Sequence, residues 1–455
     1  MPNRDKKLAI LEAMALGKTE EKLLAERNNP AKLRAAEDAL TVLLRKNPLH
    51  VGAASALLDL EEKQDRDPGD WLRSYRCPPP IADLWFKHLF IRFAERGLAE
   101  RALPLWEEHS ALFSSPYTLV LAAGMYDMTG DADQALLLYR NALRDDPLLT
   151  PVRYRVAELE SPLSLVPALP DSRRVMICLY SWNKAELLEK TLRSLADSDI
   201  GPSPVRILLN GCTDDSRARV EGLRSLFPRN DFGICELPVN IGAPAARNWL
   251  LALPETRACG AAAFLDDDVE VPADWLRRYL TLMDSDSRIG VVGGKIVHPS
   301  PSGRPSRMQY FHRYVSVAEP DLLKLTIRSP FDNTVDTGLY SYHRRCLNVM
   351  GCLHLLKREM LEDIGGFDLR FSPSQHDDIE HDLSAVLHGW HVVYCGTVTA
   401  VHHKMTGAGG EGGQTRASFG NSIGNDLKLS YKLSENLPAL VRLSREALDA
   451  TPVSP

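Results

Sequence analysis

The sequence of 455 residues lacks several features that would place it in a specialised class. Its eight cysteines form no Cys-x-x-Cys pair, so neither a disulfide framework nor a zinc ribbon is expected. No apolar run approaches the roughly 18 residues of a membrane-spanning helix, and the start shows no secretory pattern. Lysine and arginine (54) do not outnumber aspartate and glutamate (60), which argues against broad nucleic-acid binding. We therefore expect a cytoplasmic protein without a transmembrane segment that binds no nucleic acid.

What is present resembles an ordinary globular protein of several domains. Hydrophobic residues are 44% and charged residues 25%, so neither disorder nor a fibrous repeat is expected. The pattern changes near residue 165, where helical stretches give way to short β-branched runs that alternate with helices. The proline-rich stretch at 161–172 suits a linker. We predict a helical domain over 1–165, a linker over 166–173, an α/β domain over 174–405, and a flexible glycine-rich segment with a C-terminal helix over 406–455.

The helical region contains a repeat, which is clearest in residues 121–147. Its residues match the aromatic, turn-glycine, small and proline positions of a tetratricopeptide repeat at Tyr126, Gly130, Ala135, Tyr139, Ala142 and Pro147. Weaker echoes occur around 93–106 and 36–48, and residues 65–80 interrupt the array. Stacked repeats present an extended surface, which suggests docking of a protein partner. Packed helices without a regular repeat are the alternative.

Three strands and one helix can be predicted after residue 173. RVMICLY (174–180), VRILL (205–209) and AAAFL (261–265) are strand candidates, and KAELLEKTLRSLAD (184–197) is amphipathic. Alternation of strands and helices predicts a parallel sheet in an α/β layer. Ligands of such sheets bind beyond the carboxyl ends of the strands, so motifs placed there carry the most weight.

Three adjacent carboxylates, Asp266, Asp267 and Asp268, follow the third predicted strand. Such neighbours repel one another unless a cation or a hydrogen-bond donor offsets their charge. Mg²⁺ and Mn²⁺ take oxygen ligands, often one or two carboxylates together with substrate phosphates. The run therefore indicates a divalent-cation site, with an acidic loop as the alternative.

The carboxylate run FLDDDVEVPADWL (264–276) resembles the DxD segment of the family 2 glycosyltransferases, which have the Rossmann-like GT-A fold. Four further segments are similar to that family in the right order: SWNKAELLEKTLRSL (181–195), LNGCTDDS (209–216), NIGAPAARN (240–248) and GCLHLLKREMLEDIGGFDLRF (351–371). Together they cover roughly residues 173–405. The resemblance implies a nucleotide-sugar-binding GT-A domain behind the tetratricopeptide-like helical domain.

The resemblance also implies roles for individual residues. Asp268 would bind the metal ion that bridges the diphosphate of the donor. The donor nucleotide would be bound by Ser181, Trp182, Asn183, Asn210, Arg247, Asp266 and Asp267. Trp182 would offer its ring to the base, unless it packs in the core. Arg247 would reach the donor side, where a structural arginine is the alternative.

A second acidic segment, QHDDIEHDL (375–383), matches the spacing that the family shows before a Gly-aromatic pair. In that pattern Asp378 takes the place of the general base, which an acceptor hydroxyl needs because it is a poor nucleophile. Ten of the 13 histidines lie between His298 and His403. His402 and His403 follow a strand-like run, as a metal-binding histidine does in many GT-A enzymes. His402 is favoured by position, with His403 as the alternative.

Three positions depart from the family pattern. A family aspartate that contacts the base is Leu209, for which Asn210 or Asp214 could compensate. A family arginine is Ser384, and the glutamate of the Glu-Asp pair is Asp377. None of these changes removes a residue that the chemistry requires.

These features predict a metal-dependent, inverting glycosyltransferase of the hexosyltransferase type that uses Mn²⁺ or Mg²⁺. Its donor would be a nucleotide sugar, with a UDP-sugar favoured, and its acceptor a protein or a glycan. The alternative is an interaction scaffold with a degenerate transferase-like domain, although such decay would be expected to remove Asp268, Asp378 or His402. A nucleotidyltransferase is disfavoured because MICLYSWNK (176–184) contains no glycine-rich phosphate loop.

Overall fold

The computed structural model describes residues 29–64, 66, 69, 71–165, 175–300, 305–317, 325–328, 334–403 and 416–450. Contacts divide the chain into two compact units, Met1–Ala94 with Glu100–Thr118, and Glu95–Ala99 with Leu119–Pro455. The predicted linker at 166–173 and the glycine-rich stretch at 407–414 lie outside the described residues. The predicted domain boundaries therefore stay predictions.

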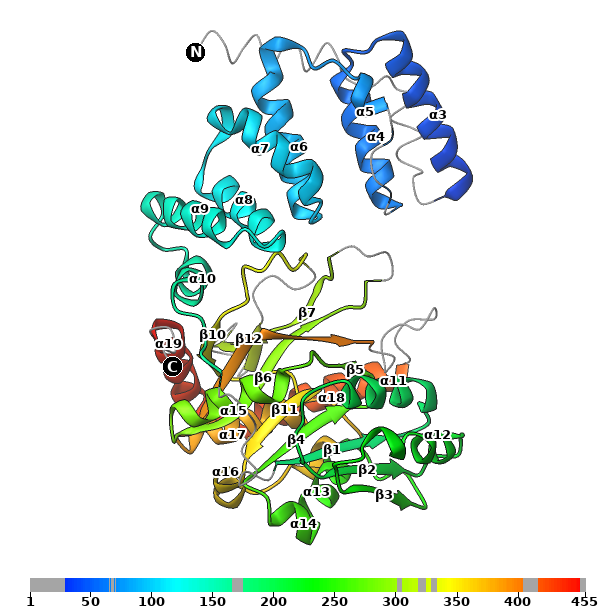
Figure 1. The fold of residues 1–455 in the computed structure, drawn as a ribbon, viewed down its shortest axis with the longest axis vertical. Helices are drawn as coiled ribbons and strands as arrows, with labels where there is room; N and C mark the ends of the chain where they lie inside the picture. Colours follow the sequence, from blue (N-terminus) through cyan, green and yellow to red (C-terminus); the bar gives the residue numbers. More distant parts are fainter. Residues whose placement is uncertain are drawn as a thin grey trace. The chain divides into compact units, whose positions relative to one another are not determined.

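The first unit is helical (Figure 1). Aromatic side chains fill part of its core, where the Phe90 ring lies 5.4 Å from Trp106 and 5.5 Å from Phe113 between ring centroids. His50 caps one helix because its Nδ1 accepts a hydrogen bond from the Ala53 amide. The helices are α3 (Pro30–Lys46), α4 (Val51–Lys63), α5 (Trp71–Ser74), α6 (Ala82–Glu95) and α7 (Ala99–Phe113).

Three further helices, α8 (Pro116–Met128), α9 (Ala132–Asp145) and α10 (Thr150–Glu160), precede the sheet. The turn between α8 and α9 needs a left-handed residue, and Gly130 supplies it with φ of 85°. Asp131 then caps α9 by accepting a hydrogen bond from the Gln134 amide. The predicted small and aromatic packing residues of α9, among them Tyr139, are fully buried. A helix-turn-helix therefore exists here, while its tetratricopeptide identity stays a prediction.

A buried ion pair links α8 and α10 within the unit that contains the sheet. The Arg155 guanidinium donates to both carboxylate oxygens of Asp127, at 2.8 and 2.7 Å. Its third contact, at 2.6 Å, is to the Ser341 carbonyl beside the sheet. Helices α8 to α10 thus pack with the α/β region.

The main sheet has the strand order β10-β12-β6-β11-β4-β1-β2-β3, with β5 and β7 attached to β12 and β6. Strands β1 (Val175–Ser181), β2 (Val205–Asn210) and β4 (Ala261–Asp266) are the three predicted strands, and they pair in parallel. β3 (Phe232–Leu237) extends this parallel half. The other half is mixed, since β11 (Leu353–Lys357) runs antiparallel to both of its neighbours.

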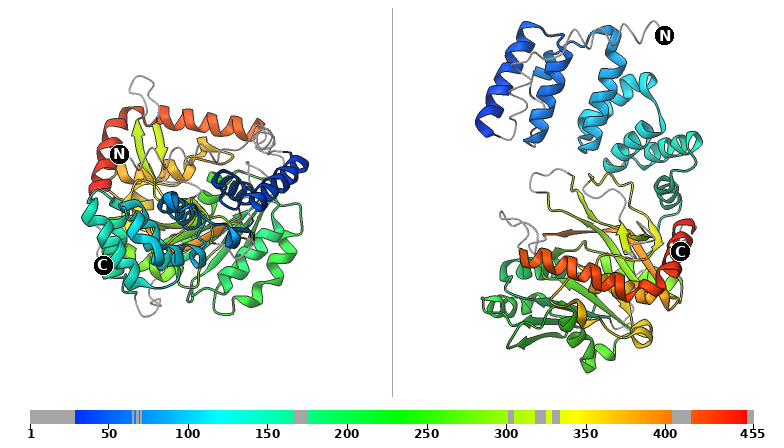
Figure 2. Two further views of the ribbon diagram at one scale, coloured as in Figure 1. Left: turned by 90° about the horizontal axis from the view of Figure 1, so that it is seen from above. Right: turned by 180° about the vertical axis from the view of Figure 1, so that it is seen from behind.

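Helices cover both faces of the sheet (Figures 1 and 2). Alternation along β1 explains the two layers, because Met176 and Cys178 belong to one buried cluster and Ile177 and Leu179 to the other. The first cluster includes side chains of α13 (Ala243–Ala252), α16 (Arg358–Ile364) and α17 (Asp377–Leu387). The second includes side chains of α11 (Ala185–Ala196), α12 (Ser216–Gly222) and α15 (Trp275–Ser285).

Strands β5, β6, β7, β10 and β12 complete the main sheet, and β8 and β9 form a separate two-stranded sheet. Helix α18 lies along the side of the sheet unit that faces the viewer in the right panel of Figure 2. None of the helices in the described part of the chain combines the length and apolar composition that spanning a membrane requires. The elements are α14 (Pro254–Arg257), β5 (Val269–Glu270), β6 (Ile289–Val297), β7 (Met308–Tyr310), β8 (Tyr314–Val317), β9 (Leu325–Arg328), β10 (His343–Cys346), β12 (His391–His402), α18 (Arg416–Lys432) and α19 (Leu437–Asp449).

Candidate active site

The carboxylate run lies at the carboxyl end of β4, in the middle of the sheet. Asp266 is the last residue of β4, and the chain then turns into the two-residue strand β5. β5 pairs with the end of β12, where His402 lies opposite Val269. The His403 amide also donates to the Asp268 carbonyl at 2.9 Å. This short pairing places the end of β12 beside the carboxylates, although more than 130 residues separate them in the sequence.

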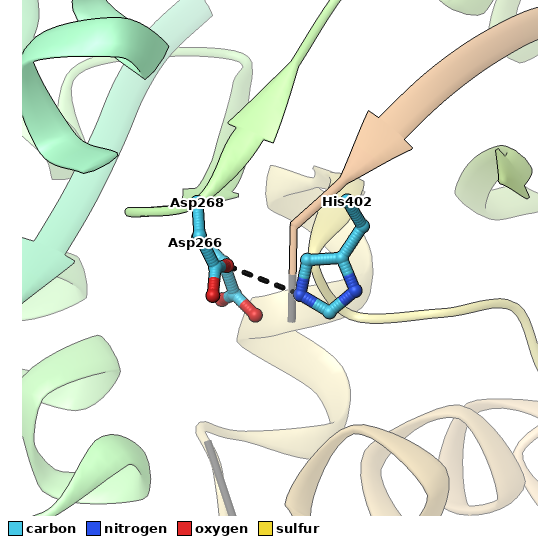
Figure 3. A group of neighbouring side chains, drawn as sticks. All are labelled: Asp266, Asp268 and His402. Atoms are coloured by element: carbon cyan, nitrogen blue, oxygen red, sulfur yellow. Dashed lines mark ion pairs between the residues drawn. The ribbon is translucent and has the colours of Figure 1, made fainter. Parts of the chain in front are cut away.

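Asp266, Asp268 and His402 form a group that could hold a metal ion (Figure 3). Their ligand atoms all lie within 4.8 Å of one another. The Nε2 atom of His402 lies 3.1 Å from Oδ1 of Asp268. Two carboxylates and one imidazole are ligands that suit Mn²⁺ and related ions.

A hydrogen bond behind His402 supports the fit to a metal. Its Nδ1 lies 2.6 Å from Oε1 of Gln309. Because an amide oxygen only accepts, Nδ1 carries the proton and Nε2 of a neutral ring directs its lone pair at Asp268. Two acceptors facing each other require a proton or a cation between them. His403 has different contacts, with Glu270 at 2.5 Å and Lys190 at 3.0 Å.

Lys184 supplies a positive charge to the same carboxylates. Its Nζ atom lies 2.9 Å from Oδ1 of Asp267 and 2.8 Å from Oδ2 of Asp268. Burial raises the pKa of Asp268, but the hydrogen bond that a protonated His402 donates, together with Lys184, holds this pKa well below its ordinary value. Burial lowers the pKa of Lys184, but the two carboxylates raise it overall.

Asp267, the middle carboxylate, is buried and turned toward the end of β1. Its Oδ2 accepts a hydrogen bond of 2.7 Å from the Ser181 hydroxyl, and Ser181 itself is 1% exposed. Burial raises the pKa of Asp267 to about 6, although Lys184 acts in the opposite direction. Ser181 therefore positions a carboxylate here, and its predicted role toward the nucleotide stays a prediction.

Trp182 and Asn183 lie in the loop that follows β1. Trp182 is 54% exposed, which is unusual for so large a ring and rules out the core-packing alternative. Asn183 has a left-handed backbone with φ of 52°, and its Oδ1 accepts a hydrogen bond from the Thr213 amide at 2.7 Å. This bond ties the loop after β1 to the loop after β2.

Asn210 ends β2 and fixes the loop that precedes α13. Its Oδ1 accepts from the Ile241 amide at 3.0 Å, and its amide donates to Asn240 at 2.9 Å. Asp214, the other residue considered for base recognition, accepts from the amide at the start of α11 and from Ser216. Leu209 is buried in the sheet. Both polar candidates therefore have structural hydrogen bonds, and their contact with a base stays a prediction.

Arg247 of α13 connects the two acidic clusters. Its guanidinium contacts Asp377 at 2.7 Å, Asp266 at 3.5 Å and the Gly351 carbonyl at 3.2 Å. The side chain is buried and lies against the face of the Tyr180 ring, 5.4 Å from its centroid. The donor-binding role of Arg247 stays a prediction, while its ion pairs are those of a buried bridge.

Asp378 lies in the first turn of α17, beside Asp377. Its Oδ2 accepts a hydrogen bond of 3.0 Å from the Gly351 amide. Burial raises the pKa of Asp378, but the positive charges of Arg247 and Arg313 and the hydrogen bond of Gly351 lower it overall. A carboxylate held ionised in this way can accept a proton at neutral pH.

Ser384, which stands where the family pattern has an arginine, shares its carboxylate partner with a lysine from another element. Glu380 is buried, and its Oε1 accepts from the Ser384 hydroxyl at 2.7 Å and from Lys432 of α18 at 2.6 Å. Lys432 also contacts Asp368 at 2.8 Å. A lysine near the end of the chain thus balances the carboxylate.

Sequence reasoning missed three polar residues of the site: Lys184, Gln309 and Lys432. Lys184 stands inside the segment that resembles the family, directly after Asn183, so its position was a usable signal. Gln309 lies on β7 and Lys432 on α18, and neither is marked by a motif.

A mixed sheet of this order, with carboxylates at the end of β4 and an acidic helix start beyond β11, defines a GT-A-like domain. Residues 170–422, more than half of the chain, match the model of the family described as "Glycosyltransferase like family 2". The chain belongs to this family.

Individual relatives are similar over parts of the chain. The succinoglycan biosynthesis protein ExoM of Rhizobium meliloti (strain 1021) is 34% identical over 146 residues, which are 31% of this chain and 44% of that protein. The chain thus spans less than half the length of this curated relative. Among solved structures, GalNAc-T7 with UDP, GalNAc and Mn²⁺ has a TM-score of 0.45 and 12% identity, covering 63% of this chain and 53% of its own. Mannosyltransferase PcManGT from Pyrobaculum calidifontis, in complex with GDP-Man and Mn²⁺, has a TM-score of 0.39 and 17% identity, covering 73% and 86%.

Proposed function

We propose that the enzyme is a metal-dependent, inverting glycosyltransferase that moves a sugar from a nucleotide-sugar donor, by preference a UDP-sugar, to an acceptor hydroxyl. The observation that carries the proposal is the pairing of two acidic groups by one buried arginine. Arg247 contacts Asp266 beside the metal-type ligands on one side and Asp377 beside Asp378 on the other. A transferase needs the metal site that binds the donor and the base that activates the acceptor next to each other.

Asp266, Asp268 and His402 would hold the divalent cation, Mn²⁺ or Mg²⁺, which supplies charge stabilisation for a leaving diphosphate. Gln309 keeps the proton of His402 on Nδ1, so that Nε2 is available as a ligand. The exposed ring of Trp182 offers a stacking face for the base.

Asp378 would remove the proton of the acceptor hydroxyl as it attacks the sugar. Its lowered pKa keeps it ionised, and the Gly351 amide fixes one of its oxygens. One base on the acceptor side is sufficient for a direct displacement, which inverts the anomeric carbon. The helical repeats would dock an acceptor or a partner protein, in the cytoplasm.

The test is donor hydrolysis by the full chain with a panel of UDP-, GDP-, dTDP- and CMP-sugars, in Mn²⁺ or in EDTA, beside Asp268→Ala. We expect slow release of one nucleotide that requires the metal and is lost in the variant. Calorimetric binding of the same panel follows if no donor is hydrolysed. Absence of binding in the presence of metal would contradict the proposal and favour the interaction scaffold.

A further inference from the structure

The acidic cluster after β4 already contains a cation of the chain itself. Lys184 contacts Asp267 and Asp268 at 2.9 and 2.8 Å, and its side chain is 17% exposed. Both carboxylates are buried, with 9% and 1% of their side chains exposed. Buried carboxylates are strongly destabilising unless they are paired.

Two basic side chains, Lys184 and His402, contact these carboxylates. Arg247 is engaged by Asp377 and by Asp266, the outer residue of the run. Lys190 pairs with Glu270 at 2.8 Å. Lys184 therefore offsets part of the negative charge of Asp267 and Asp268 when no ligand is present.

A divalent cation among Asp266, Asp268 and His402 would have to share Asp268 with this ammonium group. Lys184 contacts Oδ2 of Asp268, and His402 faces Oδ1 of the same carboxylate. Like charges on one small carboxylate repel each other, and the repulsion is large where water is scarce. Lysine has a long flexible stem, and the partial exposure of this side chain leaves it room to move.

We propose that Lys184 is a built-in counter-ion that competes with the metal ion for Asp268 and is released from it when a nucleotide diphosphate binds. The phosphates bring negative charge that the displaced ammonium group can contact. Metal and nucleotide would then bind with positive coupling, because the metal frees the ammonium group for the phosphates and the phosphates draw it away from Asp268. This inference rests on the metal site of the proposed function.

The experiment measures Mn²⁺ binding to the full chain by electron paramagnetic resonance of free Mn²⁺, with and without UDP. We expect Lys184→Met to bind Mn²⁺ alone roughly 10-fold more tightly than the wild type does, and the enhancement by UDP to shrink by a similar factor. Lys190→Met is the matched control, because it removes the same charge from α11, the helix that Lys184 precedes, but leaves the contacts of Asp268 unchanged.

Whether Lys184→Met binds Mn²⁺ more tightly or more weakly than the wild type distinguishes two roles of Lys184. If the lysine only holds the carboxylates in place, Lys184→Met will bind Mn²⁺ equally or more weakly, and the proposal is wrong. If Lys184→Met does not fold, Lys184→Gln replaces it, because this side chain loses the charge but keeps a hydrogen-bond donor. A wild type that binds no Mn²⁺, with or without UDP, would instead contradict the metal site and with it the proposed function.

Discussion

Gln309 is the residue that determines which nitrogen of His402 faces Asp268. Its Oε1 accepts from Nδ1 at 2.6 Å, and its amide group lies 3.1 Å from Nδ1 of His298. We expect Gln309→Leu to weaken Mn²⁺ binding about 10- to 100-fold, as loss of an outer partner does at other metal sites. Gln309→Glu keeps an acceptor and should retain the affinity. Calorimetric titration with Mn²⁺ checks both, and equal loss in the two variants would contradict the role.

Asp377 and Asp378 are neighbours with different expected roles. Asp378→Asn keeps an oxygen that can accept from Gly351 but removes the base, so kcat should fall by about 10²- to 10⁴-fold. UDP affinity should stay within about twofold of the wild type, because the nucleotide contacts are not touched. Transfer assays with the donor that the hydrolysis panel selects measure kcat, and UDP titrations measure the nucleotide affinity.

Asp377→Asn is the comparison variant. It leaves Arg247 buried with a single remaining charged contact, Asp266 at 3.5 Å. We expect it to lower the free energy of unfolding by about 3 kcal/mol, which urea denaturation detects as an earlier midpoint. A stable Asp377→Asn enzyme with the same kcat loss as Asp378→Asn would show that the two roles are not separate.

The sequence marked the residues of the candidate metal group better than it marked their partners, although Asp266 was predicted to contact the nucleotide and not the metal. The carboxylates, His402 and Asp378 stand in segments with a recognisable pattern, and three of them meet in one group. Lys184 and Gln309 act through the pairing of distant elements, which single-sequence patterns do not encode. Arg247 was predicted toward the donor, whereas its observed contacts are buried ion pairs with Asp377 and Asp266.

At the scale of elements, α18 contributes to the acidic cluster around α17 through Lys432. The ammonium group contacts Glu380 at 2.6 Å and Asp368 at 2.8 Å, and Glu380 is 4% exposed at its side chain. Lys432→Met should therefore destabilise the protein by about 2 kcal/mol, less than a fully buried pair because the lysine itself is partly exposed. Thermal denaturation measures the effect.

A second substitution tests whether Lys432 replaces the family arginine. Ser384 lies one helical turn after Glu380 and already donates to it at 2.7 Å. We expect Ser384→Arg in the Lys432→Met background to restore most of the lost stability. Failure of this rescue would mean that Lys432 acts mainly through Asp368.

The parallel half of the sheet could be predicted because each strand is a short apolar run bounded by a polar motif. Predicted strands at 174–180, 205–209 and 261–265 agree with β1, β2 and β4 within one residue. The antiparallel β11 and the two-residue β5 were not predicted, because their pairing depends on partners far along the chain. β5 is the element that brings His402 to Asp268. The candidate metal group therefore depends on a strand that the sequence did not predict.

At the scale of the whole molecule, the contacts of α10 indicate where the catalytic unit begins. Arg155 joins Asp127 to Ser341, and the Tyr154 ring lies 5.3 Å from Tyr342. A chain of residues 115–455 should keep the melting temperature of the sheet unit. A chain of residues 166–455 should melt about 10 °C lower, which corresponds to about 3 kcal/mol.

Calorimetry of the two truncated chains makes the comparison, and Arg155→Met in the full chain is its single-residue control. Equal melting temperatures of the two truncations would show that α8 to α10 do not contribute to the stability of the sheet unit, and that the predicted boundary at residue 165 is also a folding boundary.

The bridge made by Arg247 restricts how this enzyme can be recombined with its relatives. The loop after β4 and the start of α17 are more than 100 residues apart, yet one guanidinium contacts both. A chimera that imports a foreign acceptor-side segment without a carboxylate at position 377 would leave that arginine with one weak partner. A segment that contains position 377 therefore has to be exchanged together with α13, which carries Arg247. Chimeras designed only from domain borders would be unstable.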